Sequence, residues 1–130
     1  MILLDTHIWI WWVDDPSRLS SDYVSVIEAN EDEGLLVSRI SVWEVAKLAE
    51  KNRIKFSVPV AEWIDKATQY PGVRSVSLGN DIIIESTHLP GEFHKDPADQ
   101  LIVATARVKG ISLLTADNKI LDYPHANTLD

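Results

Sequence analysis

Four acidic residues of the chain have the type and the placement that a metal site needs: Asp5, Glu44, Asp99 and Asp117. They are far apart in the sequence, and each borders an apolar run. Carboxylate oxygens are the ligands that Mg²⁺ and Mn²⁺ prefer in proteins. A bound divalent cation can activate water and stabilise the charged oxygens of phosphodiester hydrolysis. We therefore interpret these four acids as candidate ligands of Mg²⁺ or Mn²⁺.

Three of the four acids also have ordinary structural explanations. Asp5 and Asp117 could be turn formers, since Asp readily forms hydrogen bonds with its own backbone. Glu44 could close a capping box that begins at Ser41, with Lys47 as its partner one turn later. Taken alone, each acid leaves both interpretations open, whereas one shared site accounts for all of them together.

Asp99 is harder to explain as an ordinary surface residue. It shares the i, i+3, i+4 stripe of Ile102 and Val103, on a helix that is apolar nearly all round. A carboxylate that faces a buried stripe normally has a partner, because burying an unpaired charge is costly. Asp96, directly ahead of Pro97, is interpreted as the residue that caps this helix.

The elements that must position these acids alternate along the chain. Short apolar runs predict buried strands at residues 1–4, 35–37 and 111–114, and an alternating pattern permits a strand at residues 73–78. Helical spacing and capping residues predict helices at residues 19–30, 41–49, 60–70, 80–88 and 97–109, with Ser20 or Ser21 as the first cap. This alternation favours an α/β fold in one domain, residues 1–130, with a largely parallel sheet and helices on both faces.

The order of these elements brings the four acids to one edge of the predicted sheet. Asp5 directly follows the first strand, and Asp117 follows the last. Glu44 lies in the first turn of the helix after the second strand, and Asp99 opens the helix that leads into the last strand. In open parallel sheets, ligands bind beyond the carboxyl ends of the strands. We therefore expect one metal site at that edge.

Composition excludes several classes of protein and site. The chain has no cysteine, which rules out disulfides, thiolate nucleophiles and cysteine zinc sites and fits a reducing cytoplasm. No segment reaches the roughly 18 consecutive apolar residues of a membrane span. The apolar start is interrupted by Asp5 and His7 and lacks a cationic leader, so a signal peptide is not expected. We expect a cytoplasmic protein without membrane contact.

The net charge of −8 argues against binding of nucleic acid, because phosphate contacts usually come from Lys and Arg. The basic residues are locally concentrated, however: residues 39–55 hold five of them against two acids. Part of the acidic excess would also belong to the metal site. We expect the RNA backbone to meet Arg39, Lys47, Lys51 and Lys95. The alternative is a solvated helix face with ordinary charge pairs.

Four segments that contain the acids carry a resemblance to a known family. They read LLDTH (residues 3–7), ISVWEV (40–45), HKDPADQLIVATA (94–106) and LTAD (114–117). In this order and spacing they resemble the signature blocks of PIN-domain nucleases, above all the short VapC-type toxins of bacterial toxin–antitoxin pairs. The resemblance covers essentially the whole chain.

The resemblance implies a three-layer α/β/α sandwich and a Mg²⁺- or Mn²⁺-dependent endoribonuclease. Such a protein is the toxin of a type II toxin–antitoxin system and is silenced by a small antitoxin encoded beside it. The four acids of the family fall, in order, on Asp5, Glu44, Asp99 and Asp117. The accompanying positions fall on Thr6, Thr115 and, in a His-x-Asp-Pro variant of the third block, on His94 and Asp96.

Three tryptophans directly follow the first acid: Trp9, Trp11 and Trp12. In a helix their spacing spreads them around the axis, so we expect at least one to be exposed. Exposed aromatics are enriched in interfaces. The hypothesis is that Trp11 or Trp12 lies in a homodimer interface or in the groove that receives the antitoxin. The alternative is an irregular segment folded over its own core.

Other functions stay open at this point. A PIN-like nuclease for RNA processing or repair would share these residues, and a small overlapping upstream gene would favour the toxin instead. A non-catalytic binding module on the same fold would fail a metal-binding test. A phospho-acceptor domain requires adjacent acids after the first strand and a lysine after a late strand. Here Thr6 and His7 follow Asp5, and no predicted strand ends in lysine.

Overall fold

A five-stranded parallel sheet forms the centre of the protein. The computed structural model describes residues 1–129. The strands are β1 (Ile2–Leu4), β2 (Leu35–Ser38), β3 (Val73–Val76), β4 (Ser112–Leu114) and β5 (Thr128–Leu129). Their order across the sheet is β3-β2-β1-β4-β5, and every pairing is parallel. The first strand therefore lies in the middle, with both of its faces covered.

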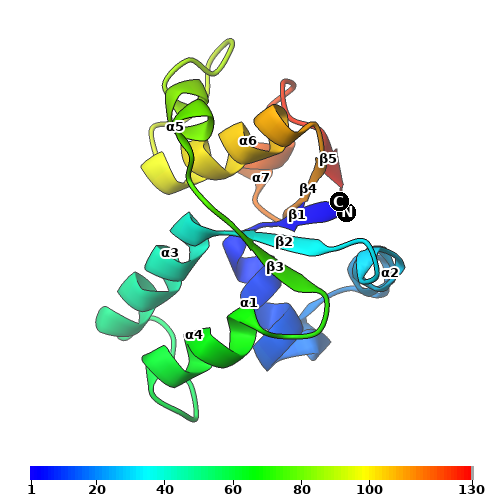
Figure 1. Ribbon diagram of the computed structural model, residues 1–130, viewed down its shortest axis with the longest axis vertical. Helices are drawn as coiled ribbons and strands as arrows, with labels where there is room; N and C mark the ends of the chain where they lie inside the picture. The colour runs from blue at the N-terminus through cyan, green and yellow to red at the C-terminus, as the bar shows by residue number, and fades with distance from the viewer. Residues whose placement is uncertain (130) are drawn as a thin grey trace.

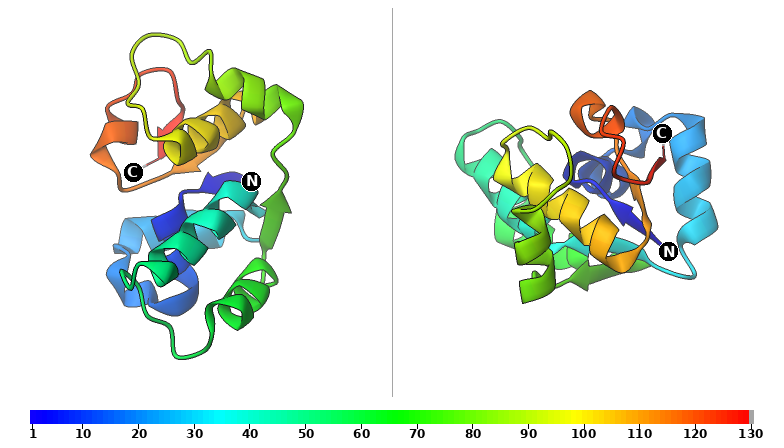
Figure 2. Two further views of the ribbon diagram at one scale, coloured as in Figure 1. Left: turned by 90° about the vertical axis from the view of Figure 1, so that its left-hand side faces the viewer. Right: turned by 90° about the horizontal axis from the view of Figure 1, so that it is seen from above.

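Helices cover both faces of this sheet (Figures 1 and 2). They are α1 (Thr6–Asp14), α2 (Ser21–Asn30), α3 (Arg39–Glu50), α4 (Val60–Thr68), α5 (Asn80–Ser86), α6 (Pro97–Lys109) and α7 (Asn118–Leu121), with a short 3₁₀ helix at Pro16–Arg18. Helices α5, α6 and α7 lie on one side of the sheet, whereas α1, α3 and α4 lie on the other. The three-layer α/β/α arrangement expected from the sequence is confirmed.

Two hydrophobic clusters hold the layers together, and the strands divide their side chains between them. Ile2 and Leu4 of β1 join the cluster built with α1, α2, α3 and α4, whereas Leu3 joins the cluster built with α5, α6 and α7. Side chains alternate along a strand, so a strand buried on both faces reads as a continuous apolar run. This is why the apolar runs in the sequence predicted β1, β2 and β4 correctly.

Helix caps gather at the carboxyl edge of the sheet. Asp5 caps α1 and directly follows β1, whereas Ser38 caps α3 and is the last residue of β2. Asp117 caps α7 shortly after the end of β4 at Leu114. Leu4 pairs with Leu114 in the register of β1 and β4, so these two strands end side by side. The parallel register therefore brings the starts of three helices to one edge.

The structure corrects the start of α3. A capping box from Ser41 to Glu44 was expected, but Ser38 is the cap, and its hydroxyl accepts a hydrogen bond from the Ile40 N–H. Strand β2 pairs with β3 up to Ser38, so the chain turns into the helix directly after the strand. Ser41 is consequently buried inside the helix rather than at its end.

The expectation of an exposed residue among the three early tryptophans is also wrong. Trp9 is fully buried, and its Nε1 donates a hydrogen bond to the carbonyl of Ala67. Trp11 and Trp12 are partly buried and pack against the same core cluster. The segment is a regular helix, but α4 packs against it through Trp63 and the Ala67 carbonyl, so more of α1 is covered than the spacing argument allowed. The exposed tryptophan is instead Trp43, at 54% of its surface.

The short elements α7, β5 and the 3₁₀ helix were not predicted, and the segment that forms α1 was left open between a helix and an irregular segment. Of the two candidate caps of α2, Ser20 is the one observed, because the Ser20 hydroxyl accepts a hydrogen bond from the Tyr23 N–H. No helix within residues 1–129 combines the length and the apolar character that crossing a lipid bilayer requires.

The two contrasting tryptophans give a direct test of the core. Trp9→Ala should lower the free energy of unfolding by about 3–5 kcal/mol, because it removes a large, fully buried side chain. Trp43→Ala, the same change at an exposed position, should cost about 0.5 kcal/mol or less. Urea denaturation followed by far-UV circular dichroism measures both. Equal losses in the two variants would contradict the placement of Trp9 in the core.

Candidate metal centre

The four predicted acids line one pocket at the carboxyl edge of the sheet. The pocket has a volume of about 340 Å³, and its walls include Asp5, Glu44, Asp99 and Asp117 together with Asp96. Asp5 follows β1, Glu44 comes from α3, Asp99 from the first turn of α6, and Asp117 from the start of α7. The structure thus brings together all four acids that the sequence placed at this edge.

Asp5 occupies the centre of a hydrogen-bond network. One carboxylate oxygen accepts the N–H of Thr6 at 2.8 Å, which caps α1. The other accepts the hydroxyl of Thr115 at 2.7 Å, and the Thr115 oxygen in turn accepts the N–H of Asp117 at 3.0 Å. Thr115 therefore ties the acid after β1 to the acid after β4.

A second network fixes Glu44. The Thr6 hydroxyl donates a short hydrogen bond to a carboxylate oxygen of Glu44. The hydroxyls of Thr6 and Ser41 lie 2.7 Å apart, and since the Thr6 hydrogen is directed to Glu44, Ser41 is the donor. Lys47 pairs with Glu50 at 3.1 Å, so the ordinary alternative for Glu44, an ion pair with Lys47, is not observed. The side chain of Glu44 is therefore held by α1 and not by its own helix.

Asp99 has a histidine as its neighbour. Nε2 of His94 lies 3.0 Å from a carboxylate oxygen of Asp99. This nitrogen is buried and has no partner in hydrogen-bond geometry among residues 1–129. The contact with Asp99 is an ion pair only when His94 is protonated. Asp96 caps α6 as expected, and its carboxylate accepts the N–H groups of Ala98 and Asp99.

Burial and like charges raise the pKa of Asp99 to about 7. Burial is the largest cause, followed by the negative charges of Asp5, Asp96, Glu44 and Asp117. Each neighbouring carboxylate disfavours the charged form of Asp99. Within residues 1–129, no Lys or Arg forms an ion pair with any of the four acids. The negative charge of the pocket is therefore left without a strong cationic partner.

Asp5 and Glu44 follow the same pattern. Burial raises the pKa of Asp5, although the hydrogen bonds from Thr115 and Thr6 act in the opposite direction. Burial also raises the pKa of Glu44 to about 6; the hydrogen bond from Thr6 opposes this, and the charges of Asp5 and Asp96 reinforce it. The site thus holds ionisable oxygens that a positive charge would stabilise.

The donor set fits a hydrated Mg²⁺ or Mn²⁺ ion. It consists of carboxylate oxygens supported by threonine and serine hydroxyls, which suits hard divalent cations. No three acidic or histidine side chains within residues 1–129 converge closely enough to enclose an ion as they stand. Mg²⁺ does not require such a cage, because it usually keeps several waters and is bound by one or two carboxylates plus substrate phosphates.

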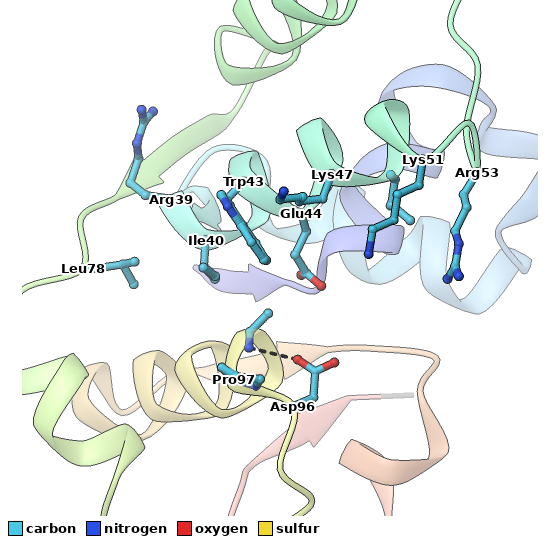
Figure 3. A pocket seen from close by; sticks show the side chains of 12 residues that line it. Arg39, Ile40, Trp43, Glu44, Lys47, Lys51, Arg53, Leu78, Asp96 and Pro97 are labelled. Atoms are coloured by element: carbon cyan, nitrogen blue, oxygen red, sulfur yellow. Dashed lines mark hydrogen bonds between the residues drawn. The ribbon is translucent and has the colours of Figure 1, made fainter.

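A larger, basic groove adjoins the acidic pocket (Figure 3). It has a volume of about 620 Å³, lies between α3 and the start of α6, and shares Glu44 and Asp96 with the acidic pocket. Of the predicted phosphate contacts, Arg39, Lys47 and Lys51 line this groove. Lys95 is exposed and belongs to the wall of neither cavity.

Sequence reasoning missed several residues of these two walls. Arg53 and Trp43 line the basic groove, and His7 and Trp11 line the acidic pocket. Arg53 belongs to the basic segment that the charge count identified. Trp43 was missed because it is uncharged, so a count of charged residues does not identify it.

Comparison with known proteins gives the family. The PIN domain family matches residues 2–126. The chain belongs to the PIN-domain family. It is also 39% identical over 124 residues to Ribonuclease VapC22 of Mycobacterium tuberculosis (strain ATCC 25618 / H37Rv), which covers 95% of this chain and 92% of the relative. The resemblance seen in the four sequence blocks is thereby confirmed.

Solved structures share the fold over nearly the whole chain. VapBC2 from Rickettsia felis, bound to a DNA fragment from its promoter, has a TM-score of 0.73 at 16% identity and covers 99% of this chain and 98% of that one. FitAcB from Neisseria gonorrhoeae has a TM-score of 0.71 at 16% identity, with coverages of 100% and 97%. VapC20 of Mycobacterium tuberculosis, a toxin that cleaves the sarcin–ricin loop, reaches 0.63 at 15%, with coverages of 98% and 99%. These likenesses confirm the PIN-like α/β/α fold.

The charge of the acidic pocket should appear in the pH dependence of stability. The pKa of Asp99 is about 7 in the folded protein, whereas it is about 4 in the unfolded chain. The folded protein then binds the proton more tightly, so the metal-free protein should lose stability as the pH rises from about 4 to about 7. Thermal unfolding in chelator across this range measures the effect.

Asp99→Asn is the matched variant for this test. It removes the charge with little change in shape, so it should unfold at a higher temperature than the wild type at pH 8, on the order of 4 °C for 1 kcal/mol. Its own stability should depend less on pH. Asp65→Asn, at an exposed position of α4, is the control. A melting temperature of Asp99→Asn below the wild type at pH 8 would contradict the repulsion.

Proposed function

We propose that the chain is a Mg²⁺- or Mn²⁺-dependent endoribonuclease, formed as one nuclease domain over residues 1–130, that acts as the toxin of a type II toxin–antitoxin system. One observation carries the proposal: four carboxylates from separate elements share one pocket in which no Lys or Arg of residues 1–129 pairs with them. The name of the relative at 39% identity, Ribonuclease VapC22, supports RNA as the substrate.

Each acid has a distinct part in the proposed site. Asp5 and Asp99 are the direct ligands, while Glu44 and Asp117 bind directly or through water. A bound divalent cation supplies an activated water and stabilises the developing negative charge on the phosphate oxygens. Thr6 and Thr115 orient the carboxylates through the hydrogen bonds described above. Asp96 orients the first turn of α6, on which Asp99 lies.

The partners follow from the same comparison. Similar solved structures include a toxin–antitoxin complex from Klebsiella pneumoniae and VapBC from Salmonella typhimurium, which supports a small cognate antitoxin for this chain. The toxin and its RNA substrate would meet in the cytoplasm. A homodimer stays a prediction, and so does a contact of Trp11 or Trp12 with a partner protein, since both side chains pack against the core and are only partly buried.

Cleavage assays test the metal site. Asp5→Asn and Asp99→Asn should each lower RNA cleavage in Mn²⁺ by about 100-fold or more, because each removes a charged ligand and leaves the fold intact. Chelator should abolish cleavage by the wild type, and Asp65→Asn should cleave normally. Total RNA incubated with the purified proteins gives the measurement. Cleavage by Asp99→Asn at the wild-type rate would remove Asp99 from the site.

The basic groove is tested separately by the salt dependence of RNA binding. The double variant Lys47→Ala/Lys51→Ala should bind RNA more weakly, and the slope of log affinity against log salt should flatten by about one unit for each phosphate that the protein no longer neutralises. Lys66→Ala, an exposed lysine of α4, is the control and should leave the slope unchanged. An unchanged slope in the double variant would mean that these lysines belong to an ordinary solvated helix face.

A further inference from the structure

One exposed aromatic side chain lies in the basic groove without a structural role there. The chain has five tryptophans. Trp9 and Trp63 are buried, and Trp11 and Trp12 pack against the core. Trp43 belongs to neither core cluster and exposes 54% of its surface. An indole in water gives up the free energy that its burial would contribute, so its place in a groove indicates a ligand.

The surroundings of Trp43 define the chemistry of that ligand. Nζ of Lys47 lies 5.8 Å from the ring centroid, and Lys51 and Arg53 project on the same side of α3 (Figure 3). In a protein with a net charge of −8, one cation beside the exposed ring and two more farther along the same groove form a local site for an anion with a planar apolar part. A groove that tracks phosphates with cations and stacks bases on aromatic rings is the usual arrangement for single-stranded nucleic acid.

Trp43 also has a fixed relation to the acidic pocket. It directly precedes Glu44 in α3, and Figure 3 shows both side chains directed into the space between α3 and the start of α6. Arg39, at the far end of the groove, extends the other way. The groove volume of about 620 Å³ falls within the range of small-ligand sites, roughly 300–1,000 Å³. A nucleotide on Trp43 would therefore be a neighbour of a phosphate at the acids.

We propose that Trp43 stacks an unpaired base of the RNA next to the cleaved phosphate. The proposal rests on the nuclease function proposed above. In duplex RNA the bases are stacked on one another, and the deep, narrow major groove excludes side chains. A base reaches an exposed indole only where the strand is unpaired. Trp43 is thus a specificity-determining residue beside the metal-binding acids.

Binding measured apart from cleavage tests the stacking platform. The probes are a fluorescently labelled RNA decamer, the same decamer in a duplex, and a set of decamers that each contain one abasic nucleotide. Anisotropy is recorded with Ca²⁺ in place of Mg²⁺, and the RNA is checked on a gel for integrity. The variants are Trp43→Ala, Trp43→Leu, which keeps an apolar side chain, and Trp43→Phe, which keeps a ring. Ile84→Ala, an exposed apolar position on α5, is the control.

The wild type should prefer the single strand to the duplex. Trp43→Ala and Trp43→Leu should bind the single strand about tenfold more weakly, whereas Trp43→Phe should retain most of the affinity. One abasic position should weaken the wild type by a similar factor and should have no further effect on Trp43→Ala, since the two changes remove the same contact. The salt slope should stay the same in all variants, because every cation of the groove is retained.

Each other outcome has a definite meaning. Equal affinity of Trp43→Ala and the wild type for the single strand would overturn the proposal while leaving the nuclease function intact, provided the wild type cleaves in Mn²⁺. Base-dependent binding without cleavage would leave the platform in place and overturn the nuclease function. If Trp43→Ala loses affinity for the cognate antitoxin and not for RNA, the groove is a protein-docking surface and the platform is wrong.

Discussion

The repulsion among carboxylates at one sheet edge is the constraint on which the rest of this structure depends. Burial and neighbouring charges raise the pKa of Asp5, Glu44 and Asp99, so the folded chain resists assembling this pocket. Backbone N–H groups and hydroxyls, rather than Lys or Arg, hold Asp5 and Glu44 in place. These neutral donors fix the geometry and leave the charge uncompensated, which is the condition under which a divalent ion binds well.

Helix α3 shows how a small shift in an element changes the role of its residues. Had the helix begun after Ser41, Ser41 and Glu44 would have satisfied one another at its end. Strand β2 instead runs to Ser38, which takes the capping role. Ser41 and Glu44 are thereby released to meet Thr6 of α1. The extra pairing between β2 and β3 is a tertiary effect, and both serines satisfy the local rule for a cap, so sequence alone did not decide between them.

Much of the fold and the edge position of the acids could be predicted because they follow from periodicity and topology. Apolar runs identify strands buried on both faces, and parallel strands bring their carboxyl ends, here Asp5 and Asp117, to the same edge. The environment of the tryptophans could not be predicted in this way. Trp63 of α4 packs edge-on against Trp9 and is itself stacked on Phe56, so residues distant in sequence determine how much of α1 is covered.

Charge is distributed so that one helix serves two purposes. Helix α3 presents Glu44 to the acidic pocket and Lys47 to the adjoining groove, where Lys51, the residue that directly follows the helix, also lies. An RNA phosphate at the acids would be repelled without a cation, whereas phosphates along the groove would be attracted with or without one. The two halves of the site therefore depend differently on metal. Because Thr6 and Ser41 fix the rotation of α3 about its axis, the network that positions Glu44 also determines where Trp43 and the lysines lie.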